Sequence, residues 1–272
     1  MSSAPWKPIL KSLISENIKN LKSTIPILPM QFSTFNASTC RPTTRTVIFR
    51  GFLGEKNNRI HENELIEYLN SISSETSLKE INPEIETDLL VITTDIRTPK
   101  VKHLLENPGF EVCWWFPSTN DQFRLSGDAY VLPPPTNPIL THFPSDLLLP
   151  YSFSVNSTSL IDQFDWEQER KRYWYEMSSD LRASFLKPPS AQEINEGEIQ
   201  NVVQELDPIG KSMDEKLLVN KALENFGLVV MKVDYVDHLE LKLTHNDNRT
   251  IWKLQKSVDL NKGEWIEKNV VP

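Results

Sequence analysis

The sequence predicts a mainly β fold, an antiparallel barrel with a few flanking helices. Short runs of β-branched and aromatic residues recur along the chain, as is typical of strands. Residues 228–243 and 249–254 alternate apolar and polar side chains, which is the period of a strand with one buried face. No regular alternation of strands and helices occurs, although a doubly wound parallel sheet would require it.

The first part of the chain is expected to form a helix and then two strands. Residues 6–21 carry apolar side chains at helical spacing, and residues 30–35 are short enough for a strand. Residues 45–50 form a β-branched and aromatic run with an arginine at each end. In a regular strand Arg45 and Arg50 would point to opposite faces, so they could meet one ligand only if the strand bends.

The central stretch, residues 88–130, is expected to fold as strand, short helix, strand, turn and strand. An apolar run at 89–92 precedes a polar turn, and apolar residues then follow at helical spacing. Asn107-Pro108-Gly109 ends this helix before the apolar run 110–116. Residues 62–72 look helical as well.

The start of that short helix is the best phosphate site in the sequence. Thr98 suits the capping position and Pro99 the first helical position. The leading backbone N–H groups of a helix have no partner inside it, and Arg97 and Lys100 would add two positive charges beside them. An anion is therefore expected here. The alternative is an ordinary surface helix start with two solvated cations.

The second half of the chain completes a single domain that spans residues 1–272. Residues 133–159 are rich in proline and serine and are expected to form an ordered loop or lid. Residues 160–186 are interpreted as one charged amphipathic helix, and the acidic stretch 192–205 as a mobile loop. Residues 228–272 supply the late strands.

Composition excludes several classes of protein. With 272 residues, 39% hydrophobic and 24% charged, the chain resembles ordinary soluble globular proteins. Its net charge of −8 argues against nucleic acid or an anionic membrane as the main partner. No stretch is apolar for long enough to span a bilayer, and the start lacks the core of a signal peptide. A cytoplasmic location is expected, with the nucleus as the alternative.

Common catalytic motifs are missing. Gly210-Lys211-Ser212 imitates the end of a phosphate-binding loop, but Glu205 stands where that motif needs glycine. The sequence contains neither G-x-G-x-x-G nor G-x-S-x-G, and its five histidines show no metal-ligand spacing. No metal site is expected, and no catalytic residue can be assigned.

Several short motifs nevertheless follow one another in a recognisable order. They are Arg45-x-Val-Ile-x-Arg50, Thr93-Thr94, Thr98-x-Lys100, Asn107-Pro108, Gln122 ahead of Ser126-Gly127, and the terminal Trp265-x5-Val271-Pro272. This series resembles the pyridoxamine 5′-phosphate oxidase family of FMN-binding split barrels. It is most similar to the eukaryotic and cyanobacterial branch with a T-T-D-x-R-[ST]-P-K signature. The resemblance is dense over residues 41–132 and sparse afterwards.

The resemblance implies a six-stranded antiparallel split barrel that forms a homodimer, holds FMN at the subunit interface and acts on a small molecule. It implies that FMN contacts come from the strand after residue 44, from the central unit and from the late strands. The predicted cofactor-binding residues are Arg45, Thr46, Val47, Ile48, Arg50, Thr93, Thr94, Arg97, Thr98, Lys100, Gln122 and Arg249. Lys100, Thr98 and the helix-start N–H groups suit a phosphate, whereas a strand backbone and the amide of Gln122 suit a flavin ring edge.

The sequence departs from the family on the substrate side. Leu239 stands near the place of a tryptophan over the cofactor, and His245 near a substrate-binding arginine. Residues 182–190 lack a clear counterpart of the group that grips the substrate phosphate. FMN is therefore better supported than a vitamin B6 substrate.

Three functions are compatible with these residues. The first is an FMN-dependent oxidoreductase in which a substrate hydride passes to flavin N5 and oxygen or another acceptor restores the flavin. The second is a flavin-binding carrier or sensor without turnover. The third is a structural dimer that has lost the cofactor.

Overall fold

The structure is a computed structural model that describes residues 4–20, 29–55, 82, 84–149, 163–190, 203–242, 247–256 and 263–272. The predicted helix at 62–72 lies outside these ranges. Most of the acidic stretch 192–205 and the end of the predicted lid, residues 150–159, also lie outside them.

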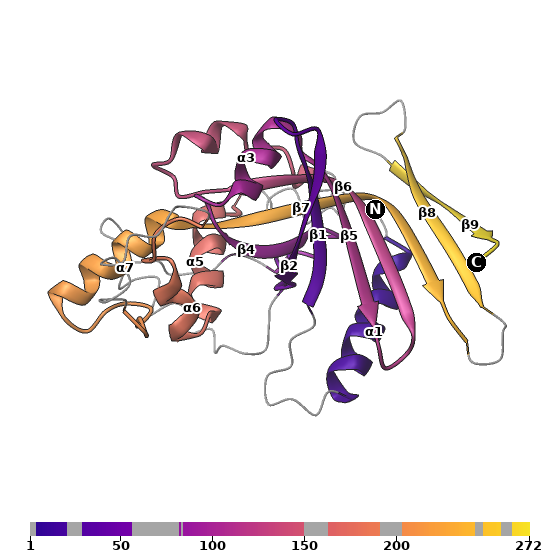
Figure 1. Ribbon diagram of the computed structural model, residues 1–272, viewed down its shortest axis with the longest axis horizontal. Helices are drawn as coiled ribbons and strands as arrows, with labels where there is room; N and C mark the ends of the chain where they lie inside the picture. The colour runs from indigo at the N-terminus through magenta and orange to yellow at the C-terminus, as the bar shows by residue number, and fades with distance from the viewer. Residues whose placement is uncertain are drawn as a thin grey trace.

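Strands make up most of the described elements, and a few helices flank them (Figure 1). The strands are β1 Pro29–Asn36, β2 Arg41–Ile48, β3 Gly51–Phe52, β4 Leu90–Asp95, β5 Gly109–Phe116, β6 Asp121–Leu132, β7 Phe226–Glu240, β8 Asn248–Lys256 and β9 Gly263–Val270. The helices are α1 Trp6–Asn20, α3 Pro99–Glu106, the 3₁₀ helix η1 Pro138–His142, α5 Trp166–Glu176, α6 Ser179–Ser184 and α7 Met213–Asn225.

Within the described ranges, all nine strands join one sheet. Its path runs β2-β1-β5-β6-β7-β4-β3, and the β8-β9 pair extends from β7. Every strand pair is antiparallel. The predicted mainly β, antiparallel fold is therefore confirmed. Figure 1 shows α5, α6 and α7 at one end of the sheet and β8 and β9 at the other.

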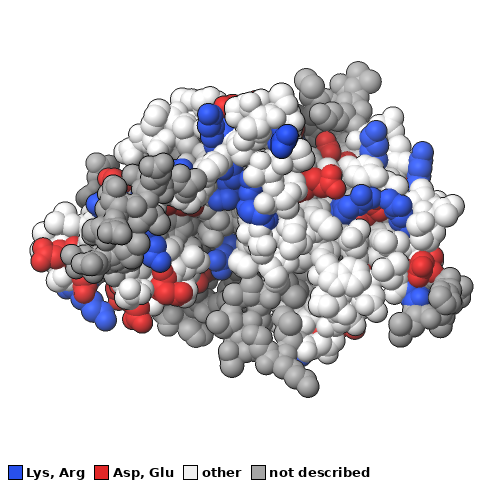
Figure 2. Space-filling model, viewed as in Figure 1, with Lys and Arg blue, Asp and Glu red and all other residues white. Residues whose placement is uncertain are grey.

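A bend between β2 and β3 joins the two ends of the sheet's path. β2 pairs with β1 and β3 pairs with β4, although only Phe49 and Arg50 separate them. The backbone N–H of Arg50 donates to the carbonyl oxygen of Val91 at 2.9 Å, which brings the bend against β4. Figure 2, drawn from the same side as Figure 1, shows Lys and Arg side chains gathered near the middle of this face, where α3, β2 and β4 meet.

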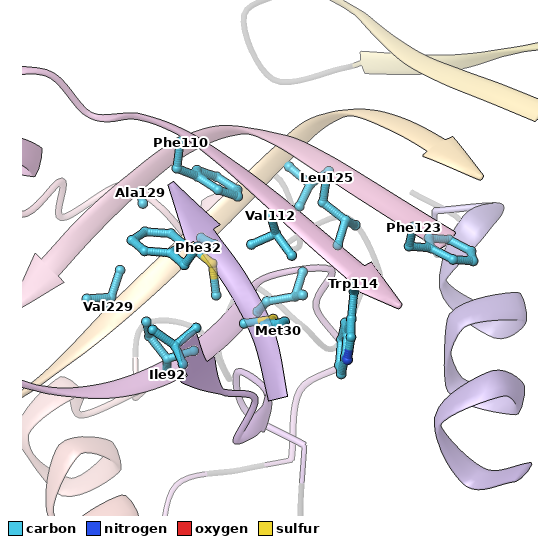
Figure 3. Packing of buried hydrophobic residues seen from close by; sticks show 14 of the residues in the cluster. Met30, Phe32, Ile92, Phe110, Val112, Trp114, Phe123, Leu125, Ala129 and Val229 are labelled. Carbon is cyan, nitrogen blue, oxygen red and sulfur yellow. The ribbon is translucent and has the colours of Figure 1, made fainter. Parts of the chain in front are cut away.

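Two apolar cores lie on opposite faces of β4 and β7. Because successive side chains of a strand alternate between faces, Leu90 and Ile92 enter one core while Leu89 and Val91 enter the other. The first, which we call the barrel core, fills the space between β1, β4, β5, β6 and β7. Figure 3 shows its members Met30, Phe32, Ile92, Phe110, Val112, Trp114, Phe123, Leu125, Ala129 and Val229. The second core is covered by α5, α6 and α7.

The prediction of a single helix at 160–186 was wrong, because the chain forms α5 and α6 with a break between them. Met177 and Ser178 have extended backbones at this break. The last carbonyl groups of a helix need partners, and the buried guanidinium of Arg182 folds back to supply them. It donates to the carbonyl oxygens of Met177 and Tyr175, the latter at 3.3 Å, and to that of Leu206 at 2.9 Å. The arginine thus stabilises a turn that hydrophobic periodicity does not reveal.

None of the helices described is long and apolar enough to cross a membrane. In the described part of the chain, no three His, Cys, Asp or Glu side chains are grouped so that they could hold a metal ion.

Candidate functional site

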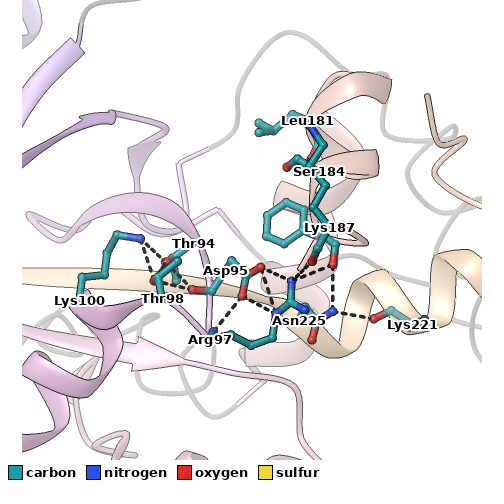
Figure 4. A network of polar contacts seen from close by, with 11 residues as sticks. Thr94, Asp95, Arg97, Thr98, Lys100, Leu181, Ser184, Lys187, Lys221 and Asn225 are labelled. Carbon is teal, nitrogen blue, oxygen red and sulfur yellow. Dashed lines mark hydrogen bonds and ion pairs between the residues drawn. The ribbon is translucent and has the colours of Figure 1, made fainter. Parts of the chain in front are cut away.

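The first turn of α3 gathers hydroxyl groups and an ammonium group where β4 ends. Thr98 is the residue before the helix and Pro99 is its first residue, as predicted, but the Thr98 hydroxyl makes no capping hydrogen bond. Instead it donates to the carbonyl oxygen of Asp95 at 2.7 Å and accepts from Lys100 Nζ at 2.9 Å. Lys100 Nζ also donates to Thr94 Oγ1 at 3.0 Å (Figure 4). The ammonium is therefore held beside a helix start that no side chain caps.

Arg45 reaches the same region from β2. Its Nη1 donates to Thr34 Oγ1 at 2.8 Å and to the carbonyl oxygen of Phe32 at 3.1 Å. Its guanidinium carbon lies 5.9 Å from the centre of the Phe32 ring. The Thr34 hydroxyl also lies 3.0 Å from Nδ1 of His103 on α3. These contacts tie β1, β2 and α3 together. We call Arg45, Thr94, Thr98 and Lys100 the α3 cluster.

The two cations of the α3 cluster are poorly neutralised. Burial and, to a smaller extent, the positive charge of Arg45 together lower the pKa of Lys100 to about 8, although Asp95 partly offsets both effects. Burial also lowers the pKa of Arg45. In the described part of the chain, neither side chain forms an ion pair with a carboxylate. An anion placed between them would relieve both the lost hydration and the mutual repulsion.

Arg97 turns away from this cluster. Its Nε and Nη2 bind the Asp95 carboxylate at 3.0 Å and 2.6 Å. Nη2 also donates to the carbonyl oxygens of Phe185 and Lys187, and Asn225 of α7 donates to Phe185 as well (Figure 4). Within the single chain, Arg97 connects the β4–α3 turn to α6 and α7 and does not join Lys100.

Arg50 and Thr93 lie together on the other face of β4. Arg50 Nε donates to Thr93 Oγ1 at 3.4 Å. Thr93 and its neighbour Thr94 point to opposite faces, because side chains alternate along the strand. The bend after β2 therefore places Arg45 and Arg50 on either side of the end of β4.

The backbone of Thr46, Val47 and Ile48 belongs to a strand with an open edge. Among the described strands, β2 pairs with β1 alone. Its second edge can therefore offer backbone N–H and C=O groups to a ligand, as expected for a strand beside a flavin ring.

Gln122 lies far from the α3 cluster in the single chain. Thr34, which accepts a hydrogen bond from Arg45 of the α3 cluster, pairs with Phe110 of β5, and Phe110 pairs with Gly127 of β6. Gln122 stands five positions along β6 from Gly127, which corresponds to about 16 Å at about 3.3 Å per residue. It faces outward opposite the half-exposed Trp115, whereas Thr34 faces the barrel core.

The predicted cofactor residue Arg249 is held on the same outward face by a shared carboxylate. Its Nε and Nη2 bind the two oxygens of Asp237 at 3.0 Å and 2.8 Å, and Arg124 Nη2 binds Asp237 Oδ2. Asp237 is buried, whereas both arginines are partly exposed. Burial opposes ionisation of Asp237, but hydrogen bonds from Arg249 and Arg124 hold its pKa below the usual value.

Replacement of Asp237 by asparagine is expected to lower the free energy of unfolding by about 2 kcal/mol at neutral pH. Breaking a buried pair leaves uncompensated charge, although the exposed parts of the arginines reduce the cost. The pKa of Asp237 lies below its ordinary value of 3.8 in the folded protein, so this stability is present above that value and disappears as the pH falls through the folded pKa. Urea unfolding of both proteins at several pH values measures it. A difference that stays constant down to strongly acidic pH would contradict the assignment.

Sequence reasoning missed Thr34 and His103. Thr34 is almost fully buried, and so is His103. One signal was present: once residues 30–35 are accepted as a strand, Thr34 falls on the inward face with Met30 and Phe32. A polar side chain at such a position needs a partner.

Residues 3–133 match the family model described as "Pyridoxamine 5′-phosphate oxidase, FMN-binding domain". The matched range contains α1, β1 to β6 and α3, and therefore the α3 cluster and Gln122. This part of the chain is therefore similar to the FMN-binding domain of pyridoxamine 5′-phosphate oxidases. The resemblance stated from the motif series is confirmed.

Two relatives match the chain over most of its length. An uncharacterized protein of Saccharomyces cerevisiae is 24% identical, covering 99% of this chain and 98% of its own. Pyridoxine/pyridoxamine 5′-phosphate oxidase 2 of Arabidopsis thaliana is 25% identical, covering 88% of this chain and 84% of its own.

Two solved structures show the same fold. A pyridoxamine 5′-phosphate oxidase-related, FMN-binding protein of Nostoc punctiforme has a TM-score of 0.60 at 23% identity, and the likeness covers 100% of both chains. PhzG of Burkholderia lata, solved with tetrahydrophenazine-1-carboxylic acid, has a TM-score of 0.55 at 10% identity, covering 99% of this chain and 93% of its own. The predicted split-barrel fold is confirmed.

Proposed function

We propose that this protein binds FMN through the α3 cluster and works as an FMN-dependent oxidoreductase. The observation that carries the proposal is the pair of half-buried cations, Arg45 and Lys100, beside an uncapped helix start. They lie within a domain whose family is FMN-binding.

The residues of the α3 cluster fit the phosphate of FMN. A phosphate monoester carries nearly two negative charges at neutral pH and three acceptor oxygens. Lys100 can supply a point charge, Arg45 can supply planar N–H donors, and the first turn of α3 adds backbone N–H groups. Residues 46–48 can face the flavin along the open edge of β2. When bound, FMN would supply the hydride acceptor, so no side-chain nucleophile is required.

The proposed FMN site is completed by a second copy of the chain. Gln122 and Arg249 face outward and away from the α3 cluster of their own chain, so a flavin held by Arg45 and Lys100 would meet them only from a partner. A twofold axis would bring the same outward face of each copy to the other. The exposed Trp115 and Phe35, with exposed fractions of 41% and 38%, support burial of this face in a homodimer.

The substrate of the proposed oxidoreductase is a small molecule that need not carry a phosphate. Arg182 begins the segment 182–190, where the family resemblance implies a group that grips a substrate phosphate. Its guanidinium is buried and donates to four carbonyl oxygens, those of Trp174, Tyr175, Met177 and Leu206. The relative from Arabidopsis is named as a pyridoxine/pyridoxamine 5′-phosphate oxidase, which makes pyridoxamine phosphate the first compound to test.

The proposal is tested on freshly purified protein. Its visible spectrum, and the mass of any small molecule released on unfolding, are expected to identify FMN. Pyridoxamine phosphate and other amines are then added without oxygen. Bleaching of the flavin supports an oxidoreductase. If the protein binds FMN but neither these amines nor a reduced nicotinamide bleaches it, turnover is contradicted. The function as a flavin-binding carrier or sensor then remains. A colourless protein that ignores added FMN would overturn the whole proposal.

The affinity for FMN is expected to fall as the pH rises above about 8. The pKa of Lys100 is about 8 in the free protein, so its charge is lost above that pH. A bound phosphate raises this pKa, and binding must then take up a proton, which lowers the affinity by up to about tenfold per pH unit. Flavin fluorescence titrations from about pH 7 to about pH 9.5 measure it, and Lys100→Met should flatten the profile. An equally steep fall in that variant would assign the effect to another group.

A further inference from the structure

We propose that Thr34 and His103 are positioning residues that hold Arg45 ready for the phosphate of FMN. The inference rests on the proposed FMN binding and adds two buried residues that do not themselves touch the cofactor. Thr34 belongs to β1, His103 to α3 and Arg45 to β2, so the three side chains join three elements at one hydroxyl group.

The hydrogen-bond roles at Thr34 Oγ1 follow from chemistry. A guanidinium can only donate, so Thr34 Oγ1 accepts from Arg45 Nη1 at 2.8 Å. Among the hydrogen bonds of the described residues, His103 Nδ1 at 3.0 Å is the one partner that can accept the proton of this hydroxyl. Donation of that proton to Nδ1 favours a neutral His103 ring that carries its own proton on Nε2. Burial and the charge of Arg45 lower the pKa of His103, which favours the same neutral form.

The anchoring leaves part of the Arg45 guanidinium for a ligand. Nη1 binds Thr34 and the carbonyl oxygen of Phe32, whereas Nε and Nη2 have no hydrogen bond among the residues that the structure describes. Arg97 and Arg249 differ from Arg45 in this respect. Nε and Nη2 of Arg97 both donate to Asp95, and Nε and Nη2 of Arg249 both donate to Asp237. Of these three predicted cofactor arginines, Arg45 is the one anchored by a single nitrogen, with a planar pair of donors left for a phosphate.

Thr34 therefore contributes to affinity by restricting Arg45 before the ligand arrives. An arginine side chain that is already ordered loses less conformational entropy on binding. Thr34→Val keeps the shape of the side chain but removes the hydroxyl, and Thr34→Ser keeps the hydroxyl. His103→Leu removes the acceptor that orients the hydroxyl, and His103→Asn keeps an acceptor in a similar place.

The experiment compares the affinities for FMN and riboflavin, which lacks the phosphate, by quenching of flavin fluorescence. In Thr34→Val the ratio of the two affinities is expected to fall roughly tenfold, with a smaller fall in His103→Leu. Thr34→Ser and His103→Asn are expected to keep the wild-type ratio. A purely structural role would lower the melting temperature and leave the ratio unchanged.

The outcomes separate this inference from the proposed function. A wild-type protein without preference for FMN over riboflavin would overturn the phosphate site itself. A wild-type preference that persists in Thr34→Val would overturn the positioning role alone. If Thr34→Val does not fold, an unchanged ratio in His103→Leu overturns it equally.

Discussion

Replacing Arg45 and Lys100 together by methionine is expected to lower the affinity for FMN by roughly 10²–10⁴-fold. Hydrogen bonds to charged groups contribute about 1.5–3 kcal/mol each, and two cations are removed. Methionine retains much of the apolar stem, so the packing against Phe32 and the first turn of α3 is largely kept. Flavin fluorescence titration of the wild-type protein and the double variant measures the effect.

The matched control is Arg41→Met together with Lys102→Met. Arg41 lies on β2 and Lys102 on α3, so the control removes the same charge from the same two elements. Both side chains are exposed, and Lys102 is 3.9 Å from Glu106. The control is expected to bind FMN within about threefold of the wild type, since surface charges contribute little. Equal losses of affinity in the two double variants would mean that FMN binding depends on the overall positive charge of β2 and α3 and not on the α3 cluster.

Gly127→Ala is expected to lower the free energy of unfolding by about 3 kcal/mol or more. The register between β6 and β7 shifts at Ser126 and Gly127, and this bulge brings β7 close to the glycine. A Cβ at Gly127 would lie 2.1 Å from the carbonyl oxygen of Lys232, and φ is +157°. A backbone atom cannot yield as a flexible side chain can, so the paired strands must separate locally.

Gly109→Ala is the control for this prediction. Gly109 begins β5, and the nearest atom to its added Cβ is the side-chain oxygen of Asn107 at 3.0 Å, which can move. Its expected cost is below about 1 kcal/mol. Urea unfolding of both variants provides the comparison, and similar losses would show that the bulge does not require glycine.

The central unit of the fold could be predicted because its signals are local. The apolar run before Asp95, Pro99 at the helix start and Asn107-Pro108-Gly109 at its end each act within a few residues. β4, α3, β5 and β6 followed as expected. The bend that brings Arg45 and Arg50 to the two sides of β4 was less accessible. The sequence showed that the two arginines could meet one ligand only if the strand bends, but periodicity could not decide whether it does.

α7 was missed although its signal was present. Ser212 accepts a hydrogen bond from the backbone N–H of Glu215, and Glu215 reaches back to the N–H of Lys211. A serine followed three residues later by glutamate is typical of a helix start.

The partners of the predicted site residues could not be read from the sequence. Asp95 and Arg97 are close in sequence, but the carbonyl groups of Phe185 and Lys187 that fix Arg97 come from the residues just after α6. Asp237 reaches Arg249 through the pairing of β7 with β8. Such long-range contacts decide which arginines retain N–H donors for a ligand. The hydrophobic pattern of the sequence does not predict these contacts.

The central claim is that the α3 cluster holds a phosphate, and the difference between FMN and riboflavin measures it most directly. The two flavins share the ring and the ribityl chain, so their affinities for wild-type protein differ by the phosphate contacts alone. The proposed site predicts that FMN binds at least about 100-fold more tightly than riboflavin, and that Arg45→Met with Lys100→Met removes most of that difference. Equal affinities of the wild-type protein for the two flavins would contradict the site.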